Sequence, residues 1–151
     1  MHGEHVIKSW STNQSVVALS SGEAEYYGLV EAASVALGIK SIGMDIGMEF
    51  AGKISIKADA SAAIGIANRV GIGKVRHIEV NQLWLQEKVY GGEMEILKVK
   101  SEENMADALT KAVDAKGIGN RVKGISAEIR KGRHPLAQKL NINDEVTEEL
   151  Y

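Results

Sequence analysis

The chain has 151 residues, of which 44% are hydrophobic and one is proline, a composition typical of a folded domain. The absence of cysteine excludes a disulfide scaffold, a cysteine nucleophile and a thiolate zinc site, and it fits a cytoplasmic or nuclear location. The formal net charge of −2 gives no global basic surface, and no apolar run reaches the roughly 20 residues that cross a membrane, so no membrane partner is expected.

Hydrophobic periodicity and turn residues predict an alternation of strands and helices, which is typical of an α/β layered domain over residues 1–115. The predicted strands are residues 5–11, 53–59 and 93–100. The predicted helices are residues 21–37, 61–68 and 78–90, and a last one that Ser101 caps and that continues through residue 113. Residues 116–151 form a charged C-terminal extension, either helical or disordered.

The start of this extension is locally basic. Between Asp114 and Lys139 the sequence holds seven Lys or Arg residues and two acids. A segment of this kind either binds phosphates or is a solvated polar tail, and charge alone does not separate the two readings.

Two glutamates lie close together at the start of the first predicted helix, in ALSSGEAEYYGL. Ser20 and Glu23 match the S-x-x-E capping box, which explains Glu23 structurally. At about 100° per residue, Glu25 is placed on the same side as Leu29 and Ala33, whereas Glu23 is placed on a polar side. The periodicity therefore predicts that Glu25 faces the core, where an acid needs a cation, a metal ion or water. An escape of Glu25 to solvent in the first turn is the alternative.

Three further residues are candidates on position alone. Asp59 ends a predicted strand, where ligands of α/β sheets gather, although it could equally be a helix cap. Asp107 falls outside the apolar stripe of its predicted helix and reads as a surface acid. His77 follows Lys74 and Arg76 in a glycine-containing loop, which is either a phosphate clamp or a polar helix start. The glycines at 71 and 73 match neither a P-loop nor a dinucleotide-binding loop.

Four segments, taken in order, resemble the ribonuclease H domain of copia-type retrotransposon Pol polyproteins. They are VIKSWSTNQSVVALSSGEAEYYGLVEAA, KADASAAIGIA, KVRHIEVNQLWLQEKV and ENMADALTKAV, and they cover about residues 5–113. The resemblance implies a ribonuclease H-like fold, a mixed sheet with flanking helices. It also implies hydrolysis of the RNA strand of an RNA–DNA hybrid, with a reverse transcriptase in the same polyprotein as a further expected partner.

The resemblance also assigns roles to individual residues. Glu25, Asp59 and Asp107 match three of the four carboxylates with which the family holds two Mg²⁺ (or Mn²⁺) ions for catalysis. His77 matches a residue near the scissile phosphate, and Lys74 and Arg76 join it as expected contacts to the nucleic-acid backbone. For Lys74 and Arg76, ordinary loop solvation is the alternative.

The fourth carboxylate of the family is an aspartate on a first strand, upstream of the segment that resembles VIKSWS. The resemblance therefore implies an N-terminally truncated domain that lacks its first two strands and the first catalytic aspartate. Three carboxylates could still hold one ion, but clamping both reacting oxygens needs two. We therefore expect weak or no cleavage by this chain. The alternative is a non-catalytic remnant that serves as a nucleic-acid or protein interaction module.

Overall fold

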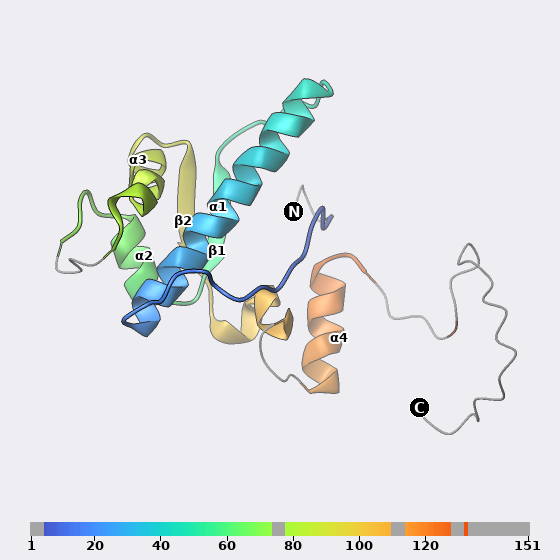
Figure 1. The fold of residues 1–151 in the computed structure, drawn as a ribbon. Helices are drawn as coiled ribbons and strands as arrows, with labels where there is room; N and C mark the ends of the chain where they lie inside the picture. The colour runs from blue at the N-terminus through green and yellow to red at the C-terminus, as the bar shows by residue number, and fades with distance from the viewer. Residues whose placement is uncertain (1–4, 74–77, 110–113, 128–131, 133–151) are drawn as a thin grey trace, which may run out of the picture.

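The computed structural model describes residues 5–73, 78–109, 114–127 and 132 of the chain. Within these residues the fold is α/β, as predicted (Figure 1). Its helices and strands are α1 (Ser21–Asp45), β1 (Ile54–Ala58), α2 (Ser61–Ala67), α3 (Trp84–Tyr90), β2 (Met94–Lys98) and α4 (Ala115–Gly124). Three short 3₁₀ turns complete them: η1 (Val80–Gln82), η2 (Ser101–Glu103) and η3 (Met105–Leu109).

The sheet of the described residues consists of β1 and β2, which pair in parallel with Ile54 opposite Met94 and Ala58 opposite Lys98. The expected mixed sheet is therefore not what these residues form. Because the strands are parallel, their carboxyl ends lie at the same edge. Whatever follows β1 and β2 in the sequence is brought together at that edge.

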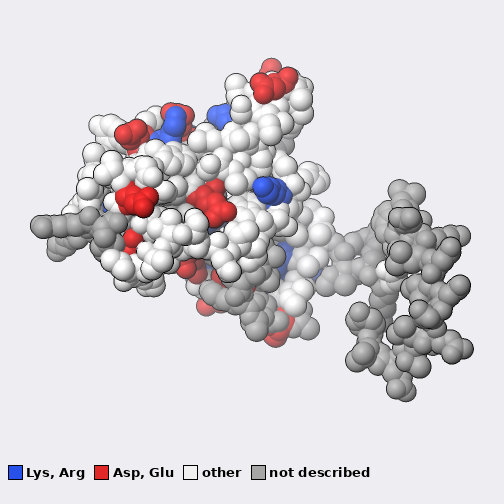
Figure 2. All heavy atoms as spheres, viewed as in Figure 1, with Lys and Arg blue, Asp and Glu red and all other residues white. Residues whose placement is uncertain are grey.

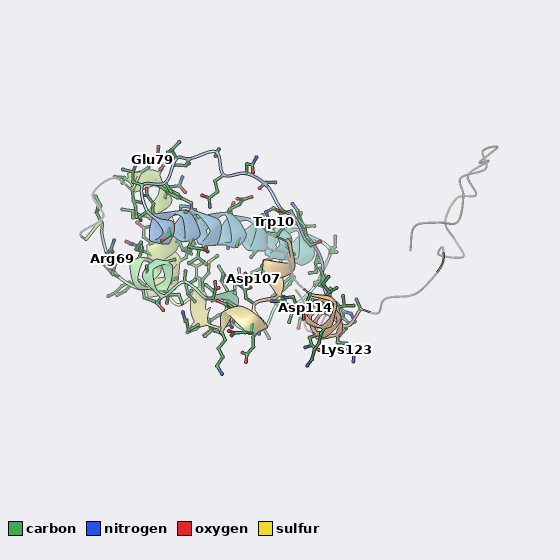
Figure 3. The ribbon with its side chains drawn as sticks, turned by 90° about the horizontal axis from the view of Figure 1, so that it is seen from below. Trp10, Arg69, Glu79, Asp107, Asp114 and Lys123 are labelled. Carbon is green, nitrogen blue, oxygen red and sulfur yellow. The ribbon has the colours of Figure 1, made fainter. Side chains whose placement is uncertain are left out.

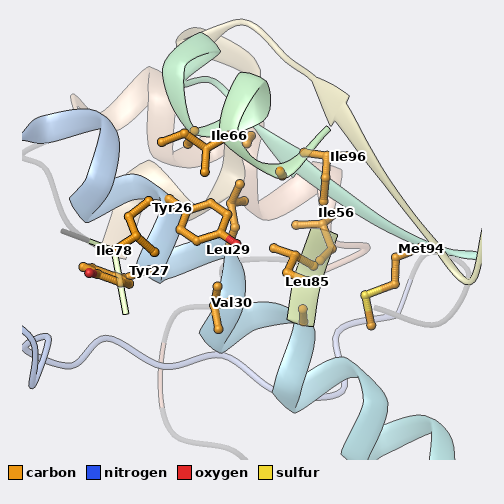
Figure 4. Packing of buried hydrophobic residues seen from close by; sticks show 14 residues of the cluster. Tyr26, Tyr27, Leu29, Val30, Ile56, Ile66, Ile78, Leu85, Met94 and Ile96 are labelled. Carbon is orange, nitrogen blue, oxygen red and sulfur yellow. The ribbon is translucent and has the colours of Figure 1, made fainter. Parts of the chain in front are cut away.

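One face of this sheet carries the hydrophobic core. Ile56 and Ile96, which are register partners, point into it, whereas Ser55 and Lys57 on the opposite face are exposed. Side chains alternate between the two faces of a strand, so the helices cover only one of them. The core cluster joins this face to α1, α2 and α3, with Tyr26 and Leu85 fully buried at its centre (Figure 4).

The predicted strand over residues 5–11 is wrong. Apart from a single-residue β-bridge at His5, this segment runs without regular structure beside α1 toward the start of that helix (Figure 1). The Trp10 indole Nε1 of this segment donates to Glu31 of α1 at 3.1 Å, and Gln14, which follows the segment, donates to the Ala24 carbonyl of α1 at 2.6 Å. The alternation in the sequence had indicated a strand, but a strand forms only where another strand pairs with it.

Three helix predictions need correction in length or type. α1 continues through Gly38 to Asp45, because one glycine costs a helix only about 1 kcal/mol. The predicted helix over residues 78–90 divides into η1 and the shorter α3. Over the described part of the helix expected after Ser101, residues 101–109, the chain forms η2 and η3 instead. Lys100, not Ser101, is the N-cap of η2, so the Ser101 side chain is not used for capping.

Substitution by alanine should have opposite effects on stability at two glycines of α1. A Cβ at Gly22 would lie 2.8 Å from the Ala62 Cβ, whereas a Cβ at Gly38 would meet nothing within 4 Å. We expect Gly22→Ala to destabilise the fold by about 1–3 kcal/mol through overpacking. Gly38→Ala should stabilise it by about 0.5–1 kcal/mol. Urea unfolding of both variants measures this, and equal effects would show that α1 does not pack on α2 at Gly22.

Candidate functional site

The first turn of α1 reverses the roles that periodicity gave to its two glutamates. Glu23 is buried, with 1% of its surface exposed, and Glu25 is exposed. The buried stripe of α1 includes Tyr26 and Val30 and is centred about 100° from Glu25 around the helix axis. Periodicity missed this because it counted tyrosine as polar, although most of a tyrosine side chain is an apolar ring.

Hydrogen bonds explain how the Glu23 carboxylate remains in the core. Its Oε1 accepts from the Tyr27 hydroxyl at 2.7 Å, and its Oε2 accepts from the Leu19 backbone N–H at 2.8 Å. The Ser20 hydroxyl accepts from the Glu23 N–H at 3.2 Å, which confirms the predicted cap. Glu23 therefore ties the chain before α1 to the first turns of the helix.

Asp59 lies directly after β1, at the carboxyl edge of the sheet, as its position in the sequence predicted. It is not a helix cap, because the N-cap of α2 is Ala60. The Ser101 hydroxyl donates to Asp59 Oδ2 at 2.6 Å, and Asn104 Nδ2 donates to Oδ1 at 3.3 Å. Both donors follow β2, so the parallel pairing of the strands makes these contacts possible.

A lysine completes this edge. Lys98, the last residue of β2, donates through Nζ to the Asp59 carbonyl, and to the Ser61 hydroxyl at 2.8 Å. The ammonium group therefore lies beside the segment that carries the Asp59 carboxylate. Sequence patterns singled out neither Lys98 nor Asn104, because their roles depend on the register of β1 against β2.

Asp107 belongs to the same edge and is buried, with 9% of its surface exposed. The prediction of a surface acid was wrong, because it assumed α-helical spacing and Asp107 lies in a 3₁₀ turn. Its backbone N–H donates to the Asn104 carbonyl at 3.3 Å. Arg121 Nε of α4 donates to the same carbonyl at 3.3 Å. Figure 3 shows Asp107 beside α4, the helix between Asp114 and Lys123.

Asn104 thus contacts Asp59 through its side chain and Asp107 through the backbone of the turn that they share, whereas Glu25 is on a different element. Gly22, one turn before Glu25, packs against Ala62 at the start of α2, so the first turn of α1 lies beside the junction of β1 and α2. In the described part of the chain, no three acidic or histidine side chains form a group that could hold a metal ion. Lys74, Arg76 and His77 lie outside the described residues.

Charge and hydrophobicity define the surroundings of the site. Acidic and basic side chains are interspersed on the face in Figure 2, and its described residues form no broad basic patch. Among the helices that the structure describes, none has the length and apolarity needed to span a bilayer.

Known proteins similar to this chain share one description. It is 32% identical over 107 residues to the retrovirus-related Pol polyprotein from transposon TNT 1-94 of Nicotiana tabacum, a match that covers 70% of this chain. It is 28% identical over 119 residues, 78% of its length, to the retrovirus-related Pol polyproteins from transposons RE1 and RE2 of Arabidopsis thaliana. Its homologues are transposon Pol polyproteins.

The match covers only a small part of each relative. The chain spans about 8% of the length of these Pol polyproteins. No protein-family model matches the chain, and no solved structure matches it either. The homology therefore indicates an origin of the sequence in a transposon polyprotein and specifies neither a domain nor an activity.

The two glutamates of α1 should differ sharply in their effect on stability. Glu23→Gln replaces a buried acceptor oxygen by an NH₂ group that cannot accept from Leu19 or Tyr27, and we expect a loss of about 1.5–3 kcal/mol. Glu25→Gln, at an exposed position, should change stability by less than about 0.5 kcal/mol. Chemical denaturation of the two isosteric variants measures the difference. A larger loss of stability in Glu25→Gln than in Glu23→Gln would favour the prediction from periodicity that Glu25 faces the core.

Stability should also fall at alkaline pH. Burial raises the pKa of Tyr26 to about 12, and burial together with the hydrogen bond to Glu23 raises the pKa of Tyr27 to about 12. In the unfolded chain a tyrosine ionises near pH 10, so the stabilisation is complete below about pH 10 and is lost as the pH rises to about 12. Denaturation at a series of pH values tests this, with Tyr27→Phe expected to flatten the dependence.

Proposed function

We propose that this chain is a ribonuclease H-type domain of a transposon Pol polyprotein, which acts on the RNA strand of RNA–DNA hybrids. The observation that carries the proposal is the position of Asp59 at the carboxyl edge of the sheet, where it accepts from the side chain of Asn104, three residues before Asp107. The resemblance assigns these two acids to one site, although they are 48 positions apart in the sequence (107 − 59). The homology to Pol polyproteins supports the same proposal independently of the site.

The donor chemistry fits Mg²⁺ or Mn²⁺ in part. Asp59 and Asp107 offer carboxylate oxygens, the donors that these ions prefer, and Glu25 would be the third ligand. A bound ion would supply the Lewis acid that activates water and stabilises the leaving oxygen. Because Glu25 does not join the two aspartates in one group, we expect at most one ion to bind and cleavage to be weak or absent.

A hollow next to β1 supports the proposal that additional strands complete the domain. The hollow has a volume of about 480 Å³ and is lined by β1 residues, by the α1 side chains Ala32, Val35 and Ile39, and by Ile7 and Trp10 of the N-terminal segment. No residue of β2 lines it, so it borders the edge of β1 that faces away from its partner. Among the described residues no strand pairs with this edge, and such an edge beside a partly apolar surface is suited to accept another strand.

The second candidate function is a non-catalytic module that contacts nucleic acid or protein. The absence of a three-ligand metal group among the described residues favours it. In this case Asp59 and Asp107 would serve to hold η2 and η3 on the sheet. The two candidates differ in whether a divalent ion binds through these acids.

Metal binding and hybrid cleavage by the full chain separate the two candidates. We expect Mn²⁺ to bind by calorimetry, and Asp59→Asn or Asp107→Asn to weaken binding by more than the roughly 10-fold that loss of an outer-shell partner costs. Glu102→Gln, an exposed acid of η2, is the matched control and should bind as the unmodified chain does. A labelled RNA–DNA hybrid should be cut weakly or not at all, and a hybrid should be bound in preference to duplex DNA.

Two results would contradict these expectations in different ways. Mn²⁺ binding that neither aspartate variant changes, without preference for a hybrid, would overturn the ribonuclease H proposal and favour the interaction module. Strong metal-dependent cutting that Asp59→Asn abolishes would confirm the reaction. It would also show that the expected impairment is wrong.

A further inference from the structure

A second hollow, which we call the aromatic cleft, lies between α1, the segment before α1 and the start of α3. It has a volume of about 410 Å³, which is large enough to hold a side chain of a partner. Tyr27 and Val30, which are buried, and Trp84, which is half-buried, form its apolar floor. Among the described residues, none of β1, β2 or the segment from Lys98 to Asp107 lines it. The aromatic cleft is therefore separate from the candidate site.

The charge of the aromatic cleft is negative. Glu31 is the one charged residue among the described residues that line it. The Trp10 indole Nε1 donates to Glu31 Oε1 at 3.1 Å, and a carboxylate has about four lone-pair positions, so Glu31 can accept further hydrogen bonds. The ion pair found within the described residues joins Lys88 to Glu93, so no described cation neutralises Glu31. A phosphate in this cleft would meet an acid and no cation, whereas a positively charged ligand would be attracted.

The polar side chains around the aromatic cleft offer further acceptors. Gln14 Nε2 donates to the Ala24 carbonyl at 2.6 Å. Because a carbonyl can only accept, this contact fixes the orientation of the Gln14 amide and leaves its Oε1 as an acceptor. The exposed hydroxyls of Ser15 and Ser34, which also line the cleft, can accept as well. The cleft therefore suits a ligand that is rich in N–H donors.

We propose that the aromatic cleft binds the arginine side chain of a partner protein. A guanidinium group is planar, carries five N–H donors and no acceptor, stacks on aromatic rings and pairs with carboxylates. Trp84 supplies the ring, and Glu31 and Gln14 supply acceptors. The chain already holds one cation over a tryptophan, since Lys8 Nζ lies 5.3 Å from the ring centroid of Trp10. This inference goes beyond the proposed function and does not depend on it.

An NMR titration of the full chain with the blocked tripeptide Ac-Gly-Arg-Gly-NH₂ tests the aromatic cleft. We expect the signals of the Trp84 indole N–H and the Ser34 backbone N–H to shift as the peptide binds. The matched citrulline peptide keeps the planar shape of arginine but has no charge, and it should bind about 10-fold more weakly. The matched lysine peptide should also bind more weakly, because an ammonium group neither stacks nor pairs bidentately.

Variants of the chain test which residues bind the peptide. Glu31→Gln, at an exposed position, should weaken binding of the arginine peptide about 10-fold. Glu87→Gln is the matched control, since Glu87 is an exposed acid of α3 that does not line the cleft. Trp84→Leu should weaken binding about 3- to 10-fold, and Trp84→Phe, which keeps a ring, should retain part of the affinity. The Ser34 signal reports binding in these variants, and thermal unfolding shows whether each one is folded.

Each outcome supports or overturns the proposal. Binding that is weakened in Glu31→Gln and unchanged in Glu87→Gln, with arginine preferred to citrulline, supports it. The proposal is overturned if the arginine peptide causes no shift, if citrulline binds equally well, or if folded Glu31→Gln binds as the unmodified chain does. Shifts caused by a single-stranded oligouridine but not by the peptide would assign the cleft to a nucleobase instead. Shifts that depend only on the concentration of the chain would assign it to a second copy.

Discussion

Parallel pairing of β1 with β2 is the constraint on which the site depends. The register places Ala58 opposite Lys98, so Asp59 and the segment from Lys98 to Asp107 leave the sheet at the same edge. An antiparallel pair would send these two segments to opposite ends. The hydrogen bond from Ser101 to the Asp59 carboxylate and the contact of Lys98 with the Asp59 carbonyl both follow from this one arrangement. The helices matter to the site mainly because α2 and α3 connect β1 to β2 in this direction.

The fold was predictable where the signal is local. Ser20 marks the start of α1 because a capping hydroxyl acts within one turn, and alternating isoleucines locate β1 within a residue or two. Prediction failed where the outcome depends on distant partners. The segment around Trp10 has the pattern of a strand but bonds to α1, and the segment around Asp107 forms 3₁₀ turns that position it against Asn104.

The candidate site was predictable to a smaller extent. Asp59 followed from its position after a strand, but Asp107 was identified through the resemblance alone, since periodicity placed it on the surface. The sequence predicts Ser101 as a cap and does not single out Asn104, because no pattern along the chain shows that both reach a carboxylate more than 40 positions earlier. The pattern of a single segment cannot predict contacts that depend on the register between two strands.

Burial of an acid is a poor guide to function in this chain. Glu23 is the most buried of the acids discussed, yet its hydrogen bonds with Leu19 and Tyr27 join the start of α1 to its own neighbourhood. Glu25 is exposed on the flank of the same turn, where an incoming ligand could reach it. A carboxylate that binds a substrate-linked ion must remain accessible, whereas one that stabilises a fold must be satisfied by protein donors. In the first turn of α1 the two requirements fall on different residues, which are two positions apart. A structural role for Glu23 therefore leaves a functional role for Glu25 open.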